Sequence, residues 1–316
     1  MNGVRAFRHR VLNTLHTVLL LAAITALAGF LGFWLLGEEG VVWAALIAVI
    51  ALVFSPRVSP RWVMRASGAR ELSPWQAPAL HRVLALLAER AGLARAPRLY
   101  YLPTRVLNAF ATGSIRDSAV TVTDGLLRAM TLRELAGVLA HEIAHVRGHD
   151  LWVMNLADVV GRLTALLSMV GQALLIVMLP LSILRGYELP LLPILALIFA
   201  PTVSLLLQLA LSRTREYHAD VVAAELTGDP AGLALALEKL EHLQGGWMER
   251  MFMAGGRMPH WLRTHPRTQE RVRRLLELRP GRPPLPQIAM PTEPDQFFEL
   301  PVITRRPSWH WHGLWH

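Results

Sequence analysis

The sequence predicts a mainly α-helical membrane protein with a small antiparallel β-sheet and about four transmembrane helices. The first observation behind this prediction is composition, since 53% of the 316 residues are hydrophobic and only 17% are charged. A typical soluble chain has about 25% charged residues. The second is the presence of four apolar segments without acidic residues, lysine or arginine; a membrane span needs about 20 such positions. These segments are residues 11–36, 41–54, 163–184 and 189–212.

The first two segments predict an N-terminal transmembrane hairpin within residues 1–60. Segment 11–36 is long enough to span a bilayer and no small-residue cleavage site follows it. We therefore interpret it as a retained anchor and not as a signal peptide. Segment 41–54 is short for a span, and the turn at 37–40 would join it to the first.

The last two segments predict a second transmembrane hairpin within residues 151–212. Segment 189–212 contains Pro190, Pro193 and Pro201, which a spanning helix tolerates, often with a kink. The alternative interpretation is a buried helical hairpin in a soluble protein, but the length of both segments favours the membrane.

The net charge of +9 comes almost entirely from arginine, because Lys239 is the single lysine. Arginines flank the apolar segments and are scarce at the turns inside each hairpin, so we expect a lipid bilayer as the partner, and no nucleic acid. The same distribution predicts a multi-pass protein of the inner or plasma membrane, with both termini and the region between the hairpins cytoplasmic. The flanking arginines are Arg5, Arg8, Arg10, Arg57, Arg61, Arg65, Arg70, Arg213 and Arg215.

Residues 61–150 predict a soluble region with helices and short strands. Leucine and valine recur at helical spacing over Pro78–Gly92, which predicts an amphipathic helix. Residues 98–102, 107–112 and 119–123 have the composition of strands, and the stretch between the last two predicts a hairpin. An extended peptide could add to the exposed edge of this sheet.

An H-E-x-x-H sequence follows the last strand, formed by His141, Glu142 and His145. Two histidines four residues apart lie on one face of a helix and can reach one metal ion, while the glutamate can take a proton from water. Thr131 and Glu134 predict a capping box that begins this helix, and Gly148 predicts its end. Since the chain has no cysteine, thiolate ligands and disulfides are excluded.

A catalytic zinc ion needs a third protein ligand. A third histidine six residues after His145 is ruled out, because Leu151 occupies that position. Residues 212–220 offer Glu216 as the ligand, and Asp220, on the same helix face, to orient a ligand histidine. His149 lies a further turn along the helix that carries His141 and His145. We expect it to support a ligand or the structure, and not to bind the metal.

Four sequence stretches resemble the HtpX-type membrane zinc metalloproteases, which are relatives of the CaaX prenyl proteases. They are H-E-I-A-H at 141–145, S-R-T-R-E-Y-H-A-D at 212–220, N-A-F-A-T-G at 108–113 and T-H-P at 264–266, and together they cover residues from about 100 to about 275. The resemblance implies a zincin-like (gluzincin) catalytic domain with one Zn²⁺ per chain.

The resemblance also implies particular roles for residues of this chain. His141, His145 and Glu216 would ligate zinc, and Glu142 would be the general base. His265 is the candidate for stabilising the tetrahedral oxyanion. Independently of the resemblance, Asn108 is the candidate for contacting a peptide added to the edge of the predicted sheet.

The remaining sequence divides into the second half of this domain and a tail. Residues 213–278 should contain a helix from Pro230 that ends at Gly245–Gly246, and a charged helix near 269–278. Arg271 on this helix could approach the site, but we expect it at the surface. Residues 279–316 are rich in proline, tryptophan and histidine, which predicts an extended tail.

These observations predict a zinc metalloendopeptidase of the EC 3.4.24 type, embedded in the membrane. The resemblance further implies a role in protein quality control and the stress response, and we expect the substrates to be misfolded or membrane proteins, cleaved at the cytoplasmic face. One alternative is a CaaX-type prenyl-protein protease, although four spans are few for its expected chamber. A second alternative is a non-catalytic zinc-binding membrane sensor or scaffold, which would have no need of Glu142 as a base.

Overall fold

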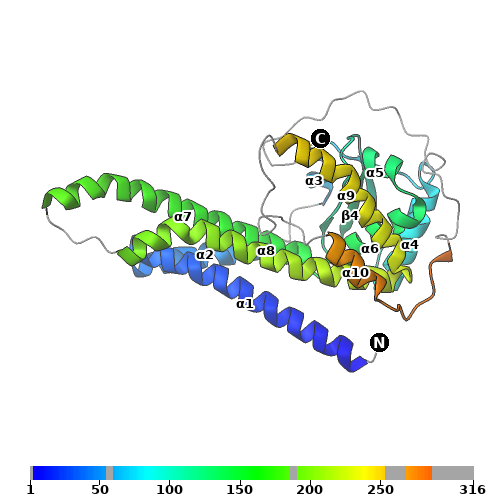
Figure 1. Ribbon diagram of the computed structural model, residues 1–316, viewed down its shortest axis with the longest axis horizontal. Coiled ribbons are helices and arrows are strands. Elements are labelled where there is room, and N and C mark those ends of the chain that lie inside the picture. Colours follow the sequence, from blue (N-terminus) through cyan, green and yellow to red (C-terminus); the bar gives the residue numbers. More distant parts are fainter. Residues whose placement is uncertain (1–2, 55–59, 186–190, 253–267, 287–316) are drawn as a thin grey trace. The chain divides into compact units, whose positions relative to one another are not determined.

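The computed structural model describes residues 3–54, 60–185, 191–252 and 268–286 (Figure 1). The described part is mostly helical, as the composition predicts. Its helices are α1 (Gly3–Leu36), α2 (Glu38–Phe54), α3 (Pro60–Ala66), α4 (Pro78–Ala91), α5 (Asp124–Ala129), α6 (Leu132–Arg147), α7 (Asp150–Arg185), α8 (Leu191–Thr227), α9 (Pro230–Phe252) and α10 (Thr268–Leu276). Its strands are β1 (Arg70–Glu71), β2 (Arg98–Leu102), β3 (Ala109–Gly113) and β4 (Ser118–Thr123).

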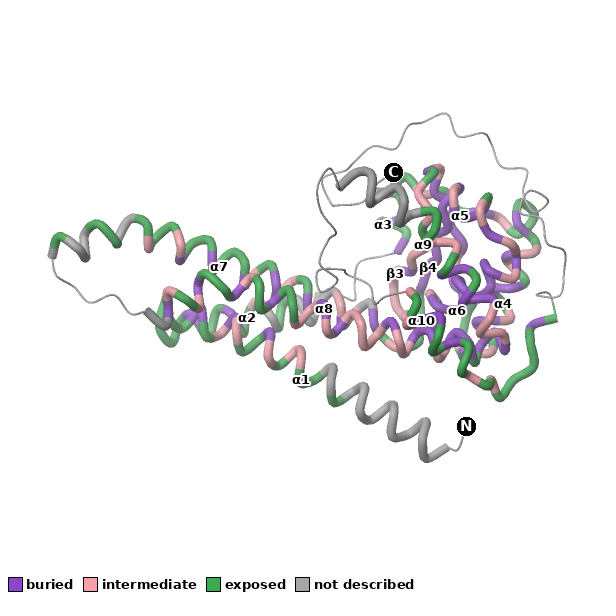
Figure 2. Tube along the Cα trace, viewed as in Figure 1, coloured by how far each residue is buried: buried purple, intermediate pink, exposed green. Residues whose placement is uncertain are grey.

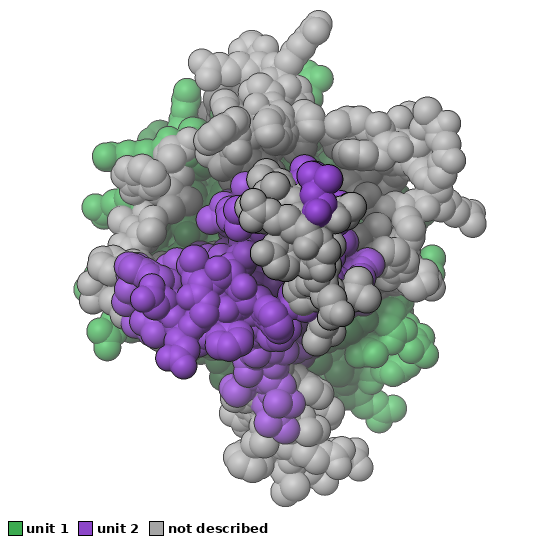
Figure 3. Space-filling view, turned by 90° about the vertical axis from the view of Figure 1, so that its left-hand side faces the viewer, with its two compact units in different colours: residues 1, 58–151, 215–316 green, residues 2–57, 152–214 purple. Residues whose placement is uncertain are grey.

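The chain forms two compact units, which Figure 3 shows in different colours. Unit 1 consists mainly of residues 58–151 and 215–316, and unit 2 consists of residues 2–57 and 152–214. The middle of the sequence therefore leaves unit 1, builds half of unit 2, and returns to unit 1. Helices α7 and α8 make the two crossings.

Unit 2 contains the apolar helices. Within the described ranges, three stretches are long and apolar enough to cross a membrane: Val18–Leu36, Trp152–Ile176 and Pro193–Thr227. Of the four segments expected from the sequence, 41–54 falls short, because α2 has only 17 residues. Many of the side chains on these helices are exposed leucine, isoleucine, valine and phenylalanine (Figure 2), as expected for surfaces that face lipid.

Helices α1 and α2 pack closely as a hairpin, as the sequence predicts. Gly37 makes the turn between them with a φ of +65°, a conformation that favours glycine. A Cβ atom added to Gly32 or to Gly40 would collide with the backbone of the other, so these two glycines permit the contact. Small residues of this kind are typical where membrane helices meet.

The sheet of unit 1 has the strand order β1-β2-β4-β3. The hairpin between β3 and β4 is antiparallel, as expected, but β2 and β4 are parallel, with Arg98 opposite Ala119. The expectation of a purely antiparallel sheet is therefore wrong, and the sheet is mixed. The reason is that β3 lies at the outer edge, so its hairpin returns β4 alongside β2 in the same direction.

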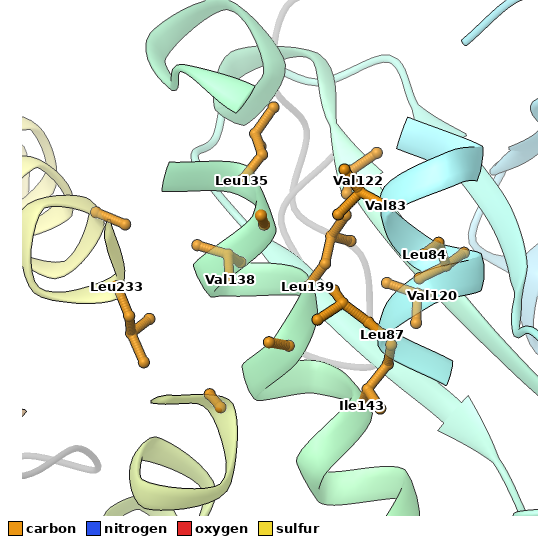
Figure 4. Close-up of a cluster of buried hydrophobic side chains, with 14 of the residues drawn as sticks. Val83, Leu84, Leu87, Val120, Val122, Leu135, Val138, Leu139, Ile143 and Leu233 are labelled. Carbon is orange, nitrogen blue, oxygen red and sulfur yellow. The ribbon is translucent and has the colours of Figure 1, made fainter. Parts of the chain in front are cut away.

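Helix α6 is the centre of the unit 1 core. Its residues Leu135, Leu139 and Ile143 are fully buried, and Figure 4 shows them between α4 and β4 on one side and α9 on the other. Gly137 lets α9 approach, since a Cβ at that position would lie 2.8 Å from the Cα of Leu233. Burial on all sides fixes the helix in place, so its polar residues are held by a rigid element.

The amphipathic helix expected at Pro78–Gly92 is confirmed as α4, which buries Leu80, Val83, Leu84 and Leu87. Helix α9 differs from expectation, because it continues through Gly245 and Gly246 to Phe252. A glycine inside a helix costs about 1 kcal/mol and ends it only when the backbone turns to a left-handed conformation.

The described start of the proline-rich segment packs against unit 1. Leu285 is fully buried in the main core, and its backbone N–H donates to the carbonyl of Thr227. The Arg90 side chain donates to the carbonyl of Pro283 at 3.1 Å. Residues 279–286 are thus extended, as predicted, and they also belong to the folded unit. The tryptophan- and histidine-rich end of the chain lies outside the described residues.

Candidate metal centre

The helix that carries the H-E-x-x-H sequence begins and ends where the sequence predicts. Thr131 caps α6, its N–H donating to the Glu134 carboxylate at 2.7 Å, and the N–H of Glu134 donates back to the Thr131 hydroxyl. Lys239 of α9 also donates to the Glu134 carboxylate. Gly148 forms the C-cap. His141 and His145 therefore lie on the last two turns of a well-anchored helix.

Three candidate ligands come together between α6 and α8. The Nε2 atoms of His141 and His145 are 3.1 Å apart. Glu216, on α8, has one oxygen 3.4 Å from the Nε2 of His141 and the other 3.7 Å from the Nε2 of His145. One ligand atom from each residue lies within 4.8 Å of the others, and the group could hold a metal ion.

The far nitrogen of each histidine faces a buried carboxylate. Asp220 has an oxygen 3.0 Å from the Nδ1 of His141, and Asp150 has one 2.8 Å from the Nδ1 of His145. A proton is therefore favoured on both Nδ1 atoms, which leaves the lone pairs of the two Nε2 atoms pointing toward one another. Two lone pairs 3.1 Å apart repel, so this place favours a cation between them, which is a shared proton when no metal is bound and a metal ion when one is. The donor set, two imidazoles and a carboxylate, fits zinc.

Arg271 of α10 neutralises the carboxylates around the site. Its guanidinium donates two hydrogen bonds of 2.7 Å to Asp220 and lies 3.1 Å from an oxygen of Glu216. The expectation that Arg271 lies at the surface is wrong, because its exposed fraction is 7%. Glu216 and Asp220 place two carboxylates on one buried helix face, which requires a nearby positive charge. This requirement was the signal in the sequence that could have indicated a buried arginine.

Arg215 pairs with Asp150, the carboxylate that faces His145. Its guanidinium donates to Asp150 at 2.6 Å, so that Asp150 is shared between Arg215 and His145. Sequence reasoning missed Asp150 and proposed its neighbour His149 for a supporting role. His149 is exposed, with a φ of +56°, just past the helix C-cap.

The charges around His141 shift its protonation. Burial lowers the pKa of His141, but the hydrogen bonds of Asp220 and Glu216 outweigh it and raise that pKa to about 10. Burial also works against ionised Asp220, yet Arg271 and His141 hold the pKa of Asp220 below its ordinary value. The site is thus a negatively charged enclosure that favours a positive charge at its centre.

Glu142 points to the sheet and not to the outer carboxylates. Burial raises the pKa of its carboxyl, and this group accepts a hydrogen bond from the backbone N–H of Ala111 in β3. Helix α6 packs against β3, the strand at the edge of the sheet. A carboxyl group with a raised pKa beside two histidines is suited to accept a proton near neutral pH.

Of the two remaining candidates, Asn108 and His265, the structure describes Asn108. Asn108 precedes β3, and its backbone exchanges hydrogen bonds with Thr123, the Asn108 N–H donating to the hydroxyl at 3.0 Å. His265 lies outside the described residues.

Apolar helices long enough to cross a membrane, together with a cluster of two histidines and a glutamate beside an H-E-x-x-H glutamate, define a membrane metallopeptidase. Residues 74–279 match the sequence profile of Peptidase family M48. The chain belongs to this family, whose members are zinc-dependent.

The chain aligns with curated relatives over nearly the whole length of each relative. The chain is 33% identical to the Protease HtpX homolog of Persephonella marina over 289 residues, which cover 84% of this chain and 98% of that protein. It is 35% identical to the Protease HtpX homolog of Burkholderia thailandensis over 296 residues, covering 85% and 99%. Among solved structures, it aligns with that of S. mikatae Ste24p at 16% identity and a TM-score of 0.47, over 85% of this chain and 66% of that one.

Proposed function

We propose that the chain is a zinc-dependent endopeptidase in which His141, His145 and Glu216 hold one Zn²⁺. The observation that carries this proposal is the orientation of the two imidazoles, whose Nδ1 atoms face Asp220 and Asp150 while their Nε2 atoms converge with Glu216. Outer carboxylates of this kind fix the ring orientation and make the histidines better ligands.

Glu142 is the general base of the proposed reaction. Bound zinc supplies a Lewis acid that makes water acidic and polarises a peptide carbonyl. The Ala111 N–H holds the Glu142 carboxylate next to the two histidines. From there Glu142 can accept the proton of the attacking water and deliver it to the leaving amine.

The free edge of β3 is the proposed binding place for the peptide. The carbonyl of Asn108 accepts from Thr123 of β4, and backbone groups of alternate residues face the same side of a strand. The backbone groups of Ala109, Ala111 and Gly113 therefore face away from β4. The Ala111 N–H is taken by Glu142, and the other groups on this side can pair with an extended substrate. In this proposal Asn108 contacts the peptide from the start of the strand, and His265 stabilises the oxyanion.

The proposed cellular role is quality control of misfolded or membrane proteins at the cytoplasmic face. Arginines near the outer ends of the apolar segments support a cytoplasmic location for both termini and for unit 1. Glu216 follows the apolar part of α8 directly in the sequence, which favours a site within reach of membrane-protein loops.

Hydrolysis of casein by the detergent-purified chain, loaded with zinc, tests this function. Glu142→Gln should abolish cleavage, by about 10³-fold or more, and still bind one zinc per chain, because only the proton acceptor is lost. Glu225→Gln, at an exposed glutamate of α8, is the matched control and should cleave at the wild-type rate. Equal activity of wild type and Glu142→Gln would refute the assignment, and a zinc-loaded wild type without activity would favour a sensor or scaffold.

A further inference from the structure

A second polar site lies in unit 1, in a pocket lined by four arginines. Arg61 comes from the first turn of α3, Arg95 and Arg98 from the segment that enters β2, and Arg116 from the turn between β3 and β4. Asp117, Ser118 and Ala96 complete the lining. The pocket lies where the parallel strands β2 and β4 both begin, since Arg98 is in register with Ala119.

The pocket has a large excess of positive charge. Arg98 donates to Asp117 at 2.7 Å, so these two charges balance one another. Arg61, Arg95 and Arg116 form no ion pair with any residue that the structure describes, and all three are exposed. Like charges gathered in one place repel, and a bound anion would relieve this repulsion.

The backbone that carries Arg61 is firmly attached to the sheet. Met64, one turn later on α3, is fully buried against Tyr100 and Ala119, and its sulfur accepts a hydrogen bond from the Thr121 hydroxyl. Pro60 packs against Gly113, where an added Cβ would lie 2.6 Å from the proline ring. The arginines therefore come from three separate segments, of which α3 is anchored to the sheet, and not from one solvated helix face.

We propose that this pocket binds a phosphate group. Guanidinium groups pair with phosphate through two parallel hydrogen bonds, and three unpaired arginines from different directions suit a tetrahedral anion better than a planar carboxylate. This site is independent of the peptidase reaction proposed above.

The phosphate can belong to an anionic phospholipid or to a soluble molecule. Arg61 follows Phe54, the last residue of the apolar helix α2, by seven positions in the sequence. A chain of that length reaches at most about 25 Å, which keeps Arg61 within reach of headgroups if α2 ends at the bilayer surface. The experiment needs one arm for each source.

The lipid arm counts phosphatidylglycerol molecules retained by the full chain in native mass spectrometry, with phosphatidylcholine as the neutral comparison. The pocket variant is Arg61→Gln/Arg116→Gln, and the control is Arg70→Gln/Arg82→Gln, which removes the same charge from exposed arginines outside the pocket. An arginine near an anionic surface contributes about 5-fold in affinity, so the pocket variant should lose roughly 25-fold. The control should lose much less, and phosphatidylcholine should be unaffected.

The soluble arm titrates inorganic phosphate into the same detergent-purified proteins by calorimetry. Loss of phosphate binding in the pocket variant alone supports the site, and if phosphatidylglycerol binding is unchanged, it assigns the site to a soluble phosphate. Arg61→Lys/Arg116→Lys keeps the charge and should bind either ligand less tightly than wild type. Equal behaviour of the pocket and control variants in both arms would overturn the proposal, provided that thermal melts show both to be folded.

Discussion

At the scale of single residues, the candidate metal centre depends on charged residues that are not themselves proposed ligands. Arg271 is held by Asp220 and in turn balances Asp220 and Glu216. One guanidinium therefore contacts both the proposed ligand Glu216 and the carboxylate that faces His141. Removing one partner from a buried charged network leaves the rest uncompensated, which costs far more than an exposed ion pair is worth.

We therefore expect Arg271→Gln to weaken zinc binding by about 10- to 100-fold and to lower activity at limiting zinc. Arg271→Lys should recover part of the affinity, because it restores the charge without the two-pronged contact to Asp220. Zinc affinity is measured by competition with a chromophoric chelator. Arg273→Gln, at an exposed position on the same helix, is the control; an Arg271→Gln protein with control-like affinity would contradict this role.

The limits of sequence reasoning are clear at these residues. His141, His145 and Glu216 were identified as one cluster because a helix places residues i and i+4 on one face and because a known family pattern supplied the third ligand. Asp150 was missed, and Arg271 was considered for the site but expected at the surface, since both meet the site through tertiary contacts that no local spacing encodes. Arg271 also belongs to a strongly charged helix, in which one buried arginine is indistinguishable from its exposed neighbours.

At the scale of secondary-structure elements, Asp229 joins helix α6, which carries the H-E-x-x-H sequence, to α9. It lies just before Pro230, where its carboxylate accepts from the N–H of Gly232, and it also pairs with Arg133 of α6. The hydrogen bond from Arg133 is the main reason that the pKa of Asp229 lies below its ordinary value. One carboxylate thus caps a helix and ties it to the element that carries the two histidines.

Asp229→Ala should lower the stability of unit 1 by about 2 kcal/mol, and Asp229→Asn by about 1 kcal/mol, since asparagine keeps the cap and loses the ion pair. A lowered pKa stabilises the fold above the ordinary aspartate pKa of about 3.9, and this contribution is lost as the pH falls through the lowered value. The difference in melting temperature between wild type and Asp229→Asn should be constant from pH 6 to 8 and shrink in acid. A difference that grew toward acid would contradict the assignment.

The elements themselves were largely predictable, and their pairing was not. Local signals correctly gave Thr131 and Gly148 as the two ends of α6, and they gave the amphipathic helix at Pro78–Gly92. The parallel pairing of Arg98 with Ala119 depends on which edge of the sheet β3 occupies, and strand periodicity carries no information about order.

At the scale of the whole molecule, a bound metal would join parts of the chain that unit 2 separates in the sequence. His145 precedes the insertion and Glu216 follows it. A ligand that binds only the folded state stabilises it by about 4 kcal/mol at a thousandfold excess over Kd. We expect chelation to lower the melting temperature of unit 1 by several degrees, with recovery on adding zinc. Glu216→Ala should melt at a temperature that is nearly independent of chelator, and a wild type that was equally insensitive would argue against a tightly held metal.

The cysteine-free chain also allows a direct test of its orientation. Arg82→Cys, on an exposed position of unit 1, should react with a membrane-impermeant maleimide only after the cells are opened. Glu39→Cys, at an exposed position in the first turn of α2, should react in intact cells. The reverse pattern would place unit 1 on the opposite side of the membrane.

The insertion of residues 152–214 into unit 1 has a consequence for how the protein is made. During synthesis His141 and His145 leave the ribosome first, and the two long apolar stretches must follow before Glu216 emerges on the far part of α8. If Glu216 is the third ligand, as we propose, a nascent chain lacks it until the two apolar stretches have been synthesised. The order of these residues in the sequence would therefore delay completion of the proposed metal site until both apolar stretches have left the ribosome.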